Sequence, residues 1–210
     1  MIKILIADDH AIVRRGLKQI VGETSDIIVA GEASDGHEAL DKISQGDYDV
    51  IVMDLSMPAL SGFDLLKRVK SEYPRIPVLI LSIHPEDQYA VRCLKAGASG
   101  YLTKESAPDE LLAAIQKVYM GGKYVSNSLA EKLAFDIGVE GEELPHTTLS
   151  DREFQVLLMI GKGKTISQIS EDLYLSPKTV STYRSRILEK MNMQNNAEIT
   201  HYTIKHGLVD

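Results

Sequence analysis

The chain has 210 residues, a formal net charge of −7 at pH 7, a hydrophobic fraction of 44% and one cysteine. This length holds one large or two small domains, and one cysteine excludes an internal disulfide. No apolar stretch approaches the roughly 20 residues of a membrane span, and the N-terminus turns acidic at Asp8, unlike a secretory signal. We therefore expect a cytoplasmic protein with no membrane partner.

The first 122 residues alternate between apolar runs and helical patterns. Strands are expected at 2–7, 27–33, 50–54, 77–82 and 100–102, and helices at 11–21, 36–43, 61–70, 86–96 and 108–120. Alternating strands and helices form a parallel sheet with helices on both faces. The predicted fold of this part is α/β, with a five-stranded doubly wound parallel sheet.

Carboxylates stand where two of these strands end. Asp8 and Asp9 follow the first strand, and Asp54 ends the apolar run of the third. The carboxyl ends of parallel strands meet at one edge of a sheet, so the three side chains should lie together. Such a group needs a cation, and oxygen ligands suit Mg²⁺ or Mn²⁺. Asp54 is then a candidate nucleophile, because carboxylates form aspartyl-phosphates.

The other strand ends carry a hydroxyl and an amine. Ser82 ends the fourth strand, and Lys104 follows the fifth. Taken singly, the two aspartates before 11–21 could cap that helix, Ser82 could be an ordinary strand-end hydroxyl, and Lys104 a solvated charge. Taken together, they supply the cation and donor that a transferred phosphoryl group needs, which favours a phosphoryl-transfer site.

Four motifs, ILIADDH, VIVMDLSMPALSG, VLILS and GASGYLTK, resemble the receiver domain of bacterial two-component response regulators over about the first 120 residues. The resemblance implies a flavodoxin-like fold in which a sensor histidine kinase or a small phosphodonor phosphorylates Asp54. The implied metal ligands are Asp9, Asp54, the Ser56 backbone carbonyl and, through water, Asp8. Lys104 is implied to contact the phosphoryl oxygens, and Ser82 and Tyr101 to form the switch pair. Tyr101 has the alternative of a plain core aromatic.

The region 123–146 is expected to be a linker with a short helix. SNSLAEKLAFDIG places Leu129, Leu133 and Ile137 on one stripe, and the acidic, glycine-containing GVEGEELPHTT that follows has no periodicity. This linker separates a domain at 1–122 from a second domain at 147–210.

Four helices are expected in the last 64 residues. A capping box at 149–153 opens the first, 165–168 opens a short second, and LSP at 175–177 is a turn before a third helix at 177–191. A fourth covers 197–206. The segment from Ser176 to Met191 contains four basic residues and one acidic residue. A short helix, a tight turn and a longer basic helix make a helix-turn-helix.

The segment LSDREFQVLLMIGKGKTISQISEDLYLSPKTVSTYRSRILEKM resembles the four-helix LuxR-type DNA-binding domain, so the whole chain resembles the NarL/FixJ family of response regulators. SPKTVSTYR and the HGLV ending are similar to the GacA/UvrY subgroup. The implied base-facing residues are Ser181, Thr182 and Ser185. The implied phosphate contacts are Lys178, Thr179, Tyr183, Arg184, Lys190, Lys164 and Thr165. The family's dimer contact on the fourth helix would use Ile199, Tyr202 and Thr203, whose alternative is a core role.

The predicted function is a regulator of transcription, not an enzyme. Phosphorylation would favour a homodimer that binds an inverted-repeat promoter site in double-stranded DNA, with RNA polymerase as a further partner. One alternative is a receiver that acts only through protein contacts. The other is an aspartyl-phosphate phosphatase, although such enzymes usually need a second Asp where Ser56 stands.

Overall fold

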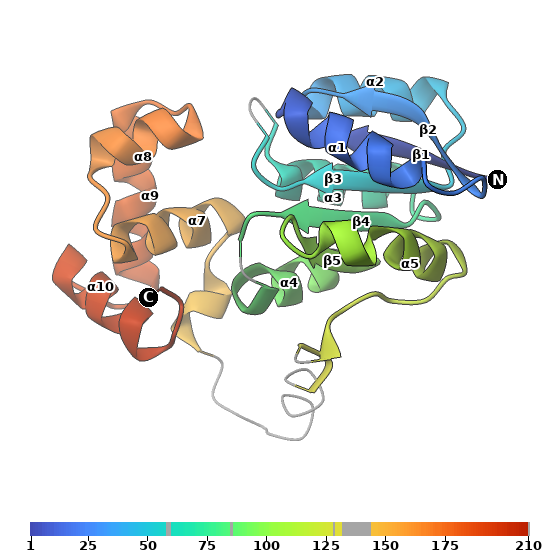
Figure 1. Ribbon diagram of the computed structural model, residues 1–210. Helices are drawn as coiled ribbons and strands as arrows, with labels where there is room; N and C mark the ends of the chain where they lie inside the picture. The colour runs from blue at the N-terminus through green and yellow to red at the C-terminus, as the bar shows by residue number, and fades with distance from the viewer. Residues whose placement is uncertain (58–59, 85, 128, 132–143, 210) are drawn as a thin grey trace. The chain divides into compact units, whose positions relative to one another are not determined.

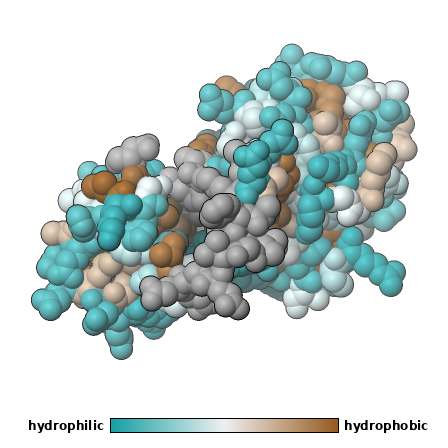
Figure 2. All heavy atoms as spheres, turned by 90° about the horizontal axis from the view of Figure 1, so that it is seen from below, coloured by the Kyte–Doolittle hydropathy of each residue, from teal (hydrophilic) through white to brown (hydrophobic). Residues whose placement is uncertain are grey.

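The computed structural model describes residues 1–57, 60–84, 86–127, 129–131 and 144–209 (Figure 1). The chain divides into two compact units, Met1–Val139 and Glu140–Asp210. No helix in the described ranges is long and apolar enough to cross a membrane. The surface in Figure 2 is mainly hydrophilic with separate apolar spots, as expected when most apolar side chains are buried.

The first unit is a five-stranded parallel sheet, as predicted. Its strands run in the order β2-β1-β3-β4-β5. The bounds are β1 Ile2–Ala7, β2 Ile27–Ala33, β3 Val50–Asp54, β4 Val78–Ser82 and β5 Gly100–Thr103. Every residue of β3 and β4 is buried, and all of them are apolar except the last residue of each strand, Asp54 and Ser82.

Helices cover both faces of this sheet. Their bounds are α1 Ala11–Val21, α2 Gly36–Gln45, α3 Gly62–Glu72, α4 Glu86–Lys95 and α5 Ala107–Tyr119. The apolar faces of α1 and α5 pack together on one face, where Leu17 and Val21 join Leu111 and Ile115 in the core. The ends differ from the expected ones by one or two residues because local caps set them. The Ser61 hydroxyl, for example, accepts a hydrogen bond from the Asp64 amide, so α3 begins at Gly62.

Gly62 allows α3 to pack tightly against the end of β3. A Cβ atom at this position would lie 2.4 Å from Leu55 Cα and 2.5 Å from the Asp54 carbonyl oxygen. Both are backbone atoms that cannot turn aside, so the close approach needs glycine. This packing holds the Asp54 backbone against the start of the helix.

The second unit consists of helices, as predicted. A 3-10 helix, η1, precedes four α-helices: η1 Pro145–Thr148, α7 Asp151–Gly161, α8 Ile166–Leu173, α9 Pro177–Lys190 and α10 Asn196–Lys205. Capping boxes open α7 at Ser150 and α8 at Thr165. Phe154, Ile169, Val180 and Ile187 form part of its buried core. The short α8, the turn and the longer α9 form the expected helix-turn-helix.

The predicted linker helix is only partly within the described residues. Leu129 is buried. Leu133 and Ile137 lie outside the described residues, as does most of the acidic segment before Leu144.

Candidate functional site

Asp8 and Asp54 lie at the carboxyl edge of the sheet because their strands are neighbours. Strands β1 and β3 pair in parallel with Ala7 opposite Met53, so the residues that follow emerge side by side. Strand order reverses between these two strands, and ligands of open α/β sheets bind at such a point. Both carboxylates are only 1% exposed. A functional site is the usual reason to bury two acids in one place.

Lys104 joins the two carboxylates. Its Nζ lies 2.7 Å from Asp8 Oδ2 and 2.8 Å from Asp54 Oδ2. Burial lowers the pKa of Lys104, but the neighbouring carboxylates of Asp54 and Asp8 outweigh burial and raise it above its ordinary value. Burial raises the pKa of Asp54, Lys104 opposes this, and the charge of Asp8 adds to it. The lysine is therefore a permanent cation at the acid that would be phosphorylated.

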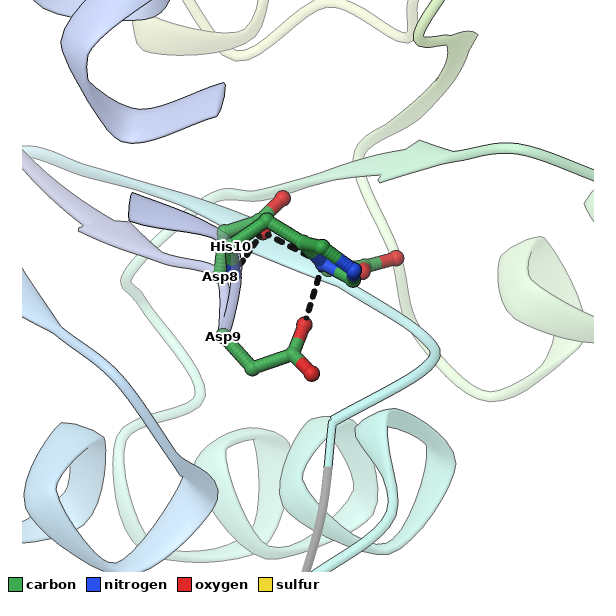
Figure 3. A group of neighbouring side chains, drawn as sticks. Asp8, Asp9 and His10 are labelled. Atoms are coloured by element: carbon green, nitrogen blue, oxygen red, sulfur yellow. Dashed lines mark hydrogen bonds and ion pairs between the residues drawn. The ribbon is translucent and has the colours of Figure 1, made fainter. Parts of the chain in front are cut away.

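A group of potential metal ligands surrounds this pair. One ligand atom from each of Asp8, Asp9, His10 and Asp54 lies within 4.8 Å of the others. Asp54 Oδ1 is buried and makes no hydrogen bond with the described part of the chain. Carboxylate oxygens suit Mg²⁺, and a buried oxygen without a hydrogen bond fits the role of a metal ligand. Figure 3 shows His10 beside Asp8 and Asp9. Sequence reasoning missed His10, although it directly follows the two aspartates.

The two residues of the implied switch pair meet at one backbone segment. Ser82 is fully buried, and its Oγ accepts a hydrogen bond from the His84 amide at 3.1 Å. Tyr101 is 1% exposed, and its hydroxyl donates to the His84 carbonyl at 2.9 Å. Burial raises the pKa of Tyr101. The ring is therefore already inside the unit, and both side chains are connected through His84, which the sequence analysis did not single out.

His84 also reaches the loop after β3. Its Nε2 lies 3.4 Å from Ser56 Oγ, and its ring stacks on Tyr89 of α4 with centroids 4.5 Å apart. Beside it, a pocket at the ends of β4 and β5 is lined by Ser82, Ile83, Glu86, Thr103, Lys104 and Glu105. Ile83 is 68% exposed there, so its bulk stands at the surface of the site rather than in the core.

In the second unit, α9 presents the implied base-facing residues and Lys178 on its outer side. Lys178, Ser181, Thr182 and Ser185 are exposed, opposite the buried Val180. Two of these hydroxyls form hydrogen bonds within the helix. Thr182 donates to the Lys178 carbonyl at 3.0 Å, and Ser185 donates to the Ser181 carbonyl at 3.1 Å. A hydroxyl rotates easily, so it can exchange this bond for a base edge.

Three of the implied phosphate contacts have partners within this unit. Lys190 Nζ lies 2.6 Å from Glu153 Oε2, and Lys164 Nζ lies 2.6 Å from Asp172 Oδ2. The Arg184 guanidinium donates to Asn196. Two of the other implied contacts lie near helix starts: Thr165 caps α8, and the Thr179 hydroxyl forms a hydrogen bond with the Ser176 hydroxyl. Tyr183 is half-buried on α9. Lys178 has no ion pair with any described residue.

Glu153 ties α7 to the end of α9. Burial raises its pKa, but hydrogen bonds from Lys190 and from Ser150 outweigh burial and lower it below its ordinary value. A carboxylate whose pKa falls on folding stabilises the fold above its unfolded pKa, and this contribution is lost as the pH falls through the folded value.

We expect Glu153→Gln to lower the stability of this unit at pH 7 by about 1–3 kcal/mol, because a buried charge-assisted hydrogen bond is lost. Thermal unfolding at several pH values measures this, and the difference from the unaltered chain should shrink in acid. Glu189→Gln, an exposed position on α9, is the control. An equal effect at both positions would show that the pair contributes nothing of its own.

The three implied dimer residues on α10 have different surroundings. Ile199 and Thr203 are fully buried within the unit, and Thr203 packs so closely on α7 that a Cβ at Gly161 would lie 2.4 Å from its Oγ1. Tyr202 is half-buried, and its hydroxyl lies 2.8 Å from His146 Nδ1. Of the three, Tyr202 alone has surface to offer another chain, while Ile199 and Thr203 fill the core.

Comparison with known families and proteins agrees with this geometry. Residues 4–116 match the response regulator receiver domain, and residues 147–203 match the luxR family of bacterial regulatory proteins. The chain is 40% identical over 209 residues to the response regulator UvrY of Escherichia coli K12, covering 99% of this chain and 96% of that protein. It is 36% identical over 211 residues to the response regulator GacA of Pseudomonas aeruginosa, covering 100% and 99%.

Solved structures of similar architecture include RcsB from Salmonella typhimurium, with a TM-score of 0.63, 25% identity and coverage of 96% of this chain and 98% of that one. A structure of an RcsB–DNA complex matches with a TM-score of 0.61 and 25% identity, covering 96% of each chain. The matches cover both units and almost the whole length. The chain therefore belongs to the NarL/FixJ family of two-component response regulators, which join a receiver domain to a LuxR-type helix-turn-helix domain.

Proposed function

We propose that this chain is a DNA-binding transcription regulator whose promoter binding is controlled by phosphorylation of Asp54. The observation that carries the proposal is the convergence of Asp8, Asp9, Asp54 and Lys104 at one sheet edge, in a chain whose other unit is a helix-turn-helix. The relatives UvrY and GacA are response regulators, and RcsB has been solved on DNA. A receiver domain controlled by phosphorylation and joined to a DNA-binding domain accounts for both units of the chain.

At the receiver site, an Asp54 carboxylate oxygen attacks the phosphorus of a phosphohistidine on the sensor kinase, or of acetyl phosphate, and the bond to the donor breaks. Lys104, 2.8 Å from Asp54 Oδ2, stays to pair with the phosphoryl oxygens. Asp9, Asp54, the Ser56 carbonyl and, through water, Asp8 would hold Mg²⁺, which neutralises charge on the phosphoryl group. Ser82 supplies a hydroxyl donor to the new group, and Tyr101 follows its position.

In the second unit, α9 enters the major groove with Ser181, Thr182 and Ser185 toward base edges and Lys178 toward a phosphate. Phosphorylation favours a dimer on DNA, with Tyr202 of α10 near the contact. A two-fold dimer reads inverted half-sites about 10 base pairs apart, or a multiple of that spacing. RNA polymerase would be the partner of the DNA-bound dimer. The protein would act in the cytoplasm, where it can contact both the kinase and the promoter.

The two alternative functions have less support. A phosphatase would need an acid-base carboxylate at the place of Ser56, whose hydroxyl instead lies near His84. A receiver that acts only by protein contact leaves the exposed lysine and hydroxyl residues of α9, and the match of residues 147–203 to the luxR family, without a role.

A gel-shift titration with and without a phosphodonor tests the proposal. The probe is a duplex selected by the protein from a random-sequence pool, and the phosphodonor is acetyl phosphate with Mg²⁺. We expect phosphorylation to tighten binding roughly tenfold, since effector coupling is typically 1–3 kcal/mol. If the protein binds no duplex specifically, even when Asp54 is fully phosphorylated, the protein-contact alternative is favoured. Steady turnover of a phosphomonoester would favour the phosphatase.

A further inference from the structure

The imidazole of His10 lies in the acidic group at the sheet edge. Its Nδ1 is 2.7 Å from Asp9 Oδ1 and 3.4 Å from Asp8 Oδ1. Figure 3 shows the ring beside the two carboxylates. The His10 amide also donates to Asp8 Oδ1 at 2.8 Å, which fixes the backbone from which the ring extends. The side chain is 60% exposed, so an ion from solvent can reach the ring.

The net charge of this group and its unused hydrogen-bonding capacity both favour binding of a divalent cation. Three carboxylates face one ammonium, that of Lys104, which leaves two negative charges to be neutralised. Asp54 Oδ1 is buried at 1% residue exposure and makes no hydrogen bond with any described residue, so this oxygen is available as a metal ligand. His10 is the one nitrogen donor of this four-residue group.

We propose that His10 is a ligand of the cation, so that this site binds Mn²⁺ more tightly than Mg²⁺. The inference rests on the proposed function, because it concerns the same phosphorylation site. An imidazole nitrogen that carries no proton can bind a metal ion, and Nδ1 is the His10 ring nitrogen that lies beside Asp9. Mg²⁺ prefers oxygen ligands and keeps its water, whereas first-row transition metals accept imidazole nitrogen. The added nitrogen therefore stabilises Mn²⁺ selectively.

Mn²⁺ binding to the full-length chain tests this ligand directly. Free Mn²⁺ is measured by electron paramagnetic resonance, with Mg²⁺ as the competitor, and pulsed measurements on the bound ion detect coupling to nitrogen. We expect nitrogen coupling in the unaltered chain, its loss in His10→Asn, and a fall of roughly tenfold in the preference for Mn²⁺. His37→Asn, an exposed histidine on α2, is the matched control and should keep the coupling.

Two outcomes would overturn the inference. One is bound Mn²⁺ without coupling to the His10 nitrogen, and the other is an equal loss of affinity for both ions in His10→Asn, which would mean that the ring only orients Asp9. Thermal unfolding of each variant identifies a folding defect separately. Phosphoryl labelling of the unaltered chain at Asp54 tests the proposed function on its own, so failure of the nitrogen ligand and failure of the phosphorylation site are distinguishable.

Discussion

Asp54→Asn is expected to abolish phosphoryl labelling of the chain by radioactive acetyl phosphate, to less than about 1% of the unaltered level, since a side chain amide is not a nucleophile for phosphorus. The Lys104 cation and Asp8 keep their positions in this variant, so the loss reports the missing carboxylate. Asp47→Asn is the control, because Asp47 is 95% exposed in its side chain and lies on the turn before β3. Labelling that persists in Asp54→Asn would show that another residue accepts the phosphoryl group.

The same variant should make the receiver more stable at neutral pH. Burial raises the pKa of Asp54, so the folded state binds more protons than the unfolded state at pH values just above the ordinary one. Stability then falls as the pH rises through that range, and the cost persists at pH 7. Removing the charge removes this cost, and Lys104 keeps its ion pair with Asp8, so the expected gain is about 1 kcal/mol in unfolding free energy without added metal. A loss of stability instead would show that the Lys104 pair outweighs burial.

Lys178→Ala is expected to weaken binding to every DNA sequence by a similar factor, since a phosphate contact carries no base information. A dimer has two copies of Lys178, so the expected loss is roughly tenfold to hundredfold at low salt, and the slope of log affinity against log salt should fall by about two. Titrations at several salt concentrations, on the selected duplex and on an unrelated one, measure both quantities.

Arg15→Ala is the charge-matched control for this experiment. Arg15 is an exposed residue of α1 in the receiver unit, so its substitution changes the net charge equally and leaves the sequence of α9 unaltered. The phosphate role would be contradicted by a loss confined to the selected duplex, since that result would make Lys178 a reader of bases.

The sequence was sufficient to predict both folds. Apolar runs such as Val50–Met53 and their alternation with amphipathic helices determine a parallel sheet, because only a strand covered on both faces can be apolar throughout. The capping boxes at Ser150 and Thr165 likewise mark the starts of α7 and α8, because a cap depends on residues three apart in sequence. Helix ends were less predictable, since a neighbouring side chain decides which amide is capped.

The acidic edge was also predictable, since parallel strands bring their carboxyl ends together whatever the details of packing. What the sequence could not decide was which polar groups meet. The bridge from Lys104 to both Asp8 and Asp54, the placement of His10 against Asp9, and the meeting of Ser82 and Tyr101 at His84 depend on distances across strands. In the second unit, the burial of Ile199 and Thr203 and the pairing of Lys190 with Glu153 depend on how α10 and α9 pack on α7.

The proposed phosphoacceptor, Asp54, shows this division most directly. Its position at the end of a buried strand follows from local sequence, because apolar residues with a period-free pattern specify such a strand and its last residue is charged. Its electrostatic state does not, because the pKa of a buried carboxylate depends on the solvent it has lost and on charges from other strands. The sequence by itself thus determined which residue is the candidate acceptor and which helix is the candidate DNA reader. Only the tertiary structure decided which cations and donors surround them, because those contacts join residues far apart in the chain.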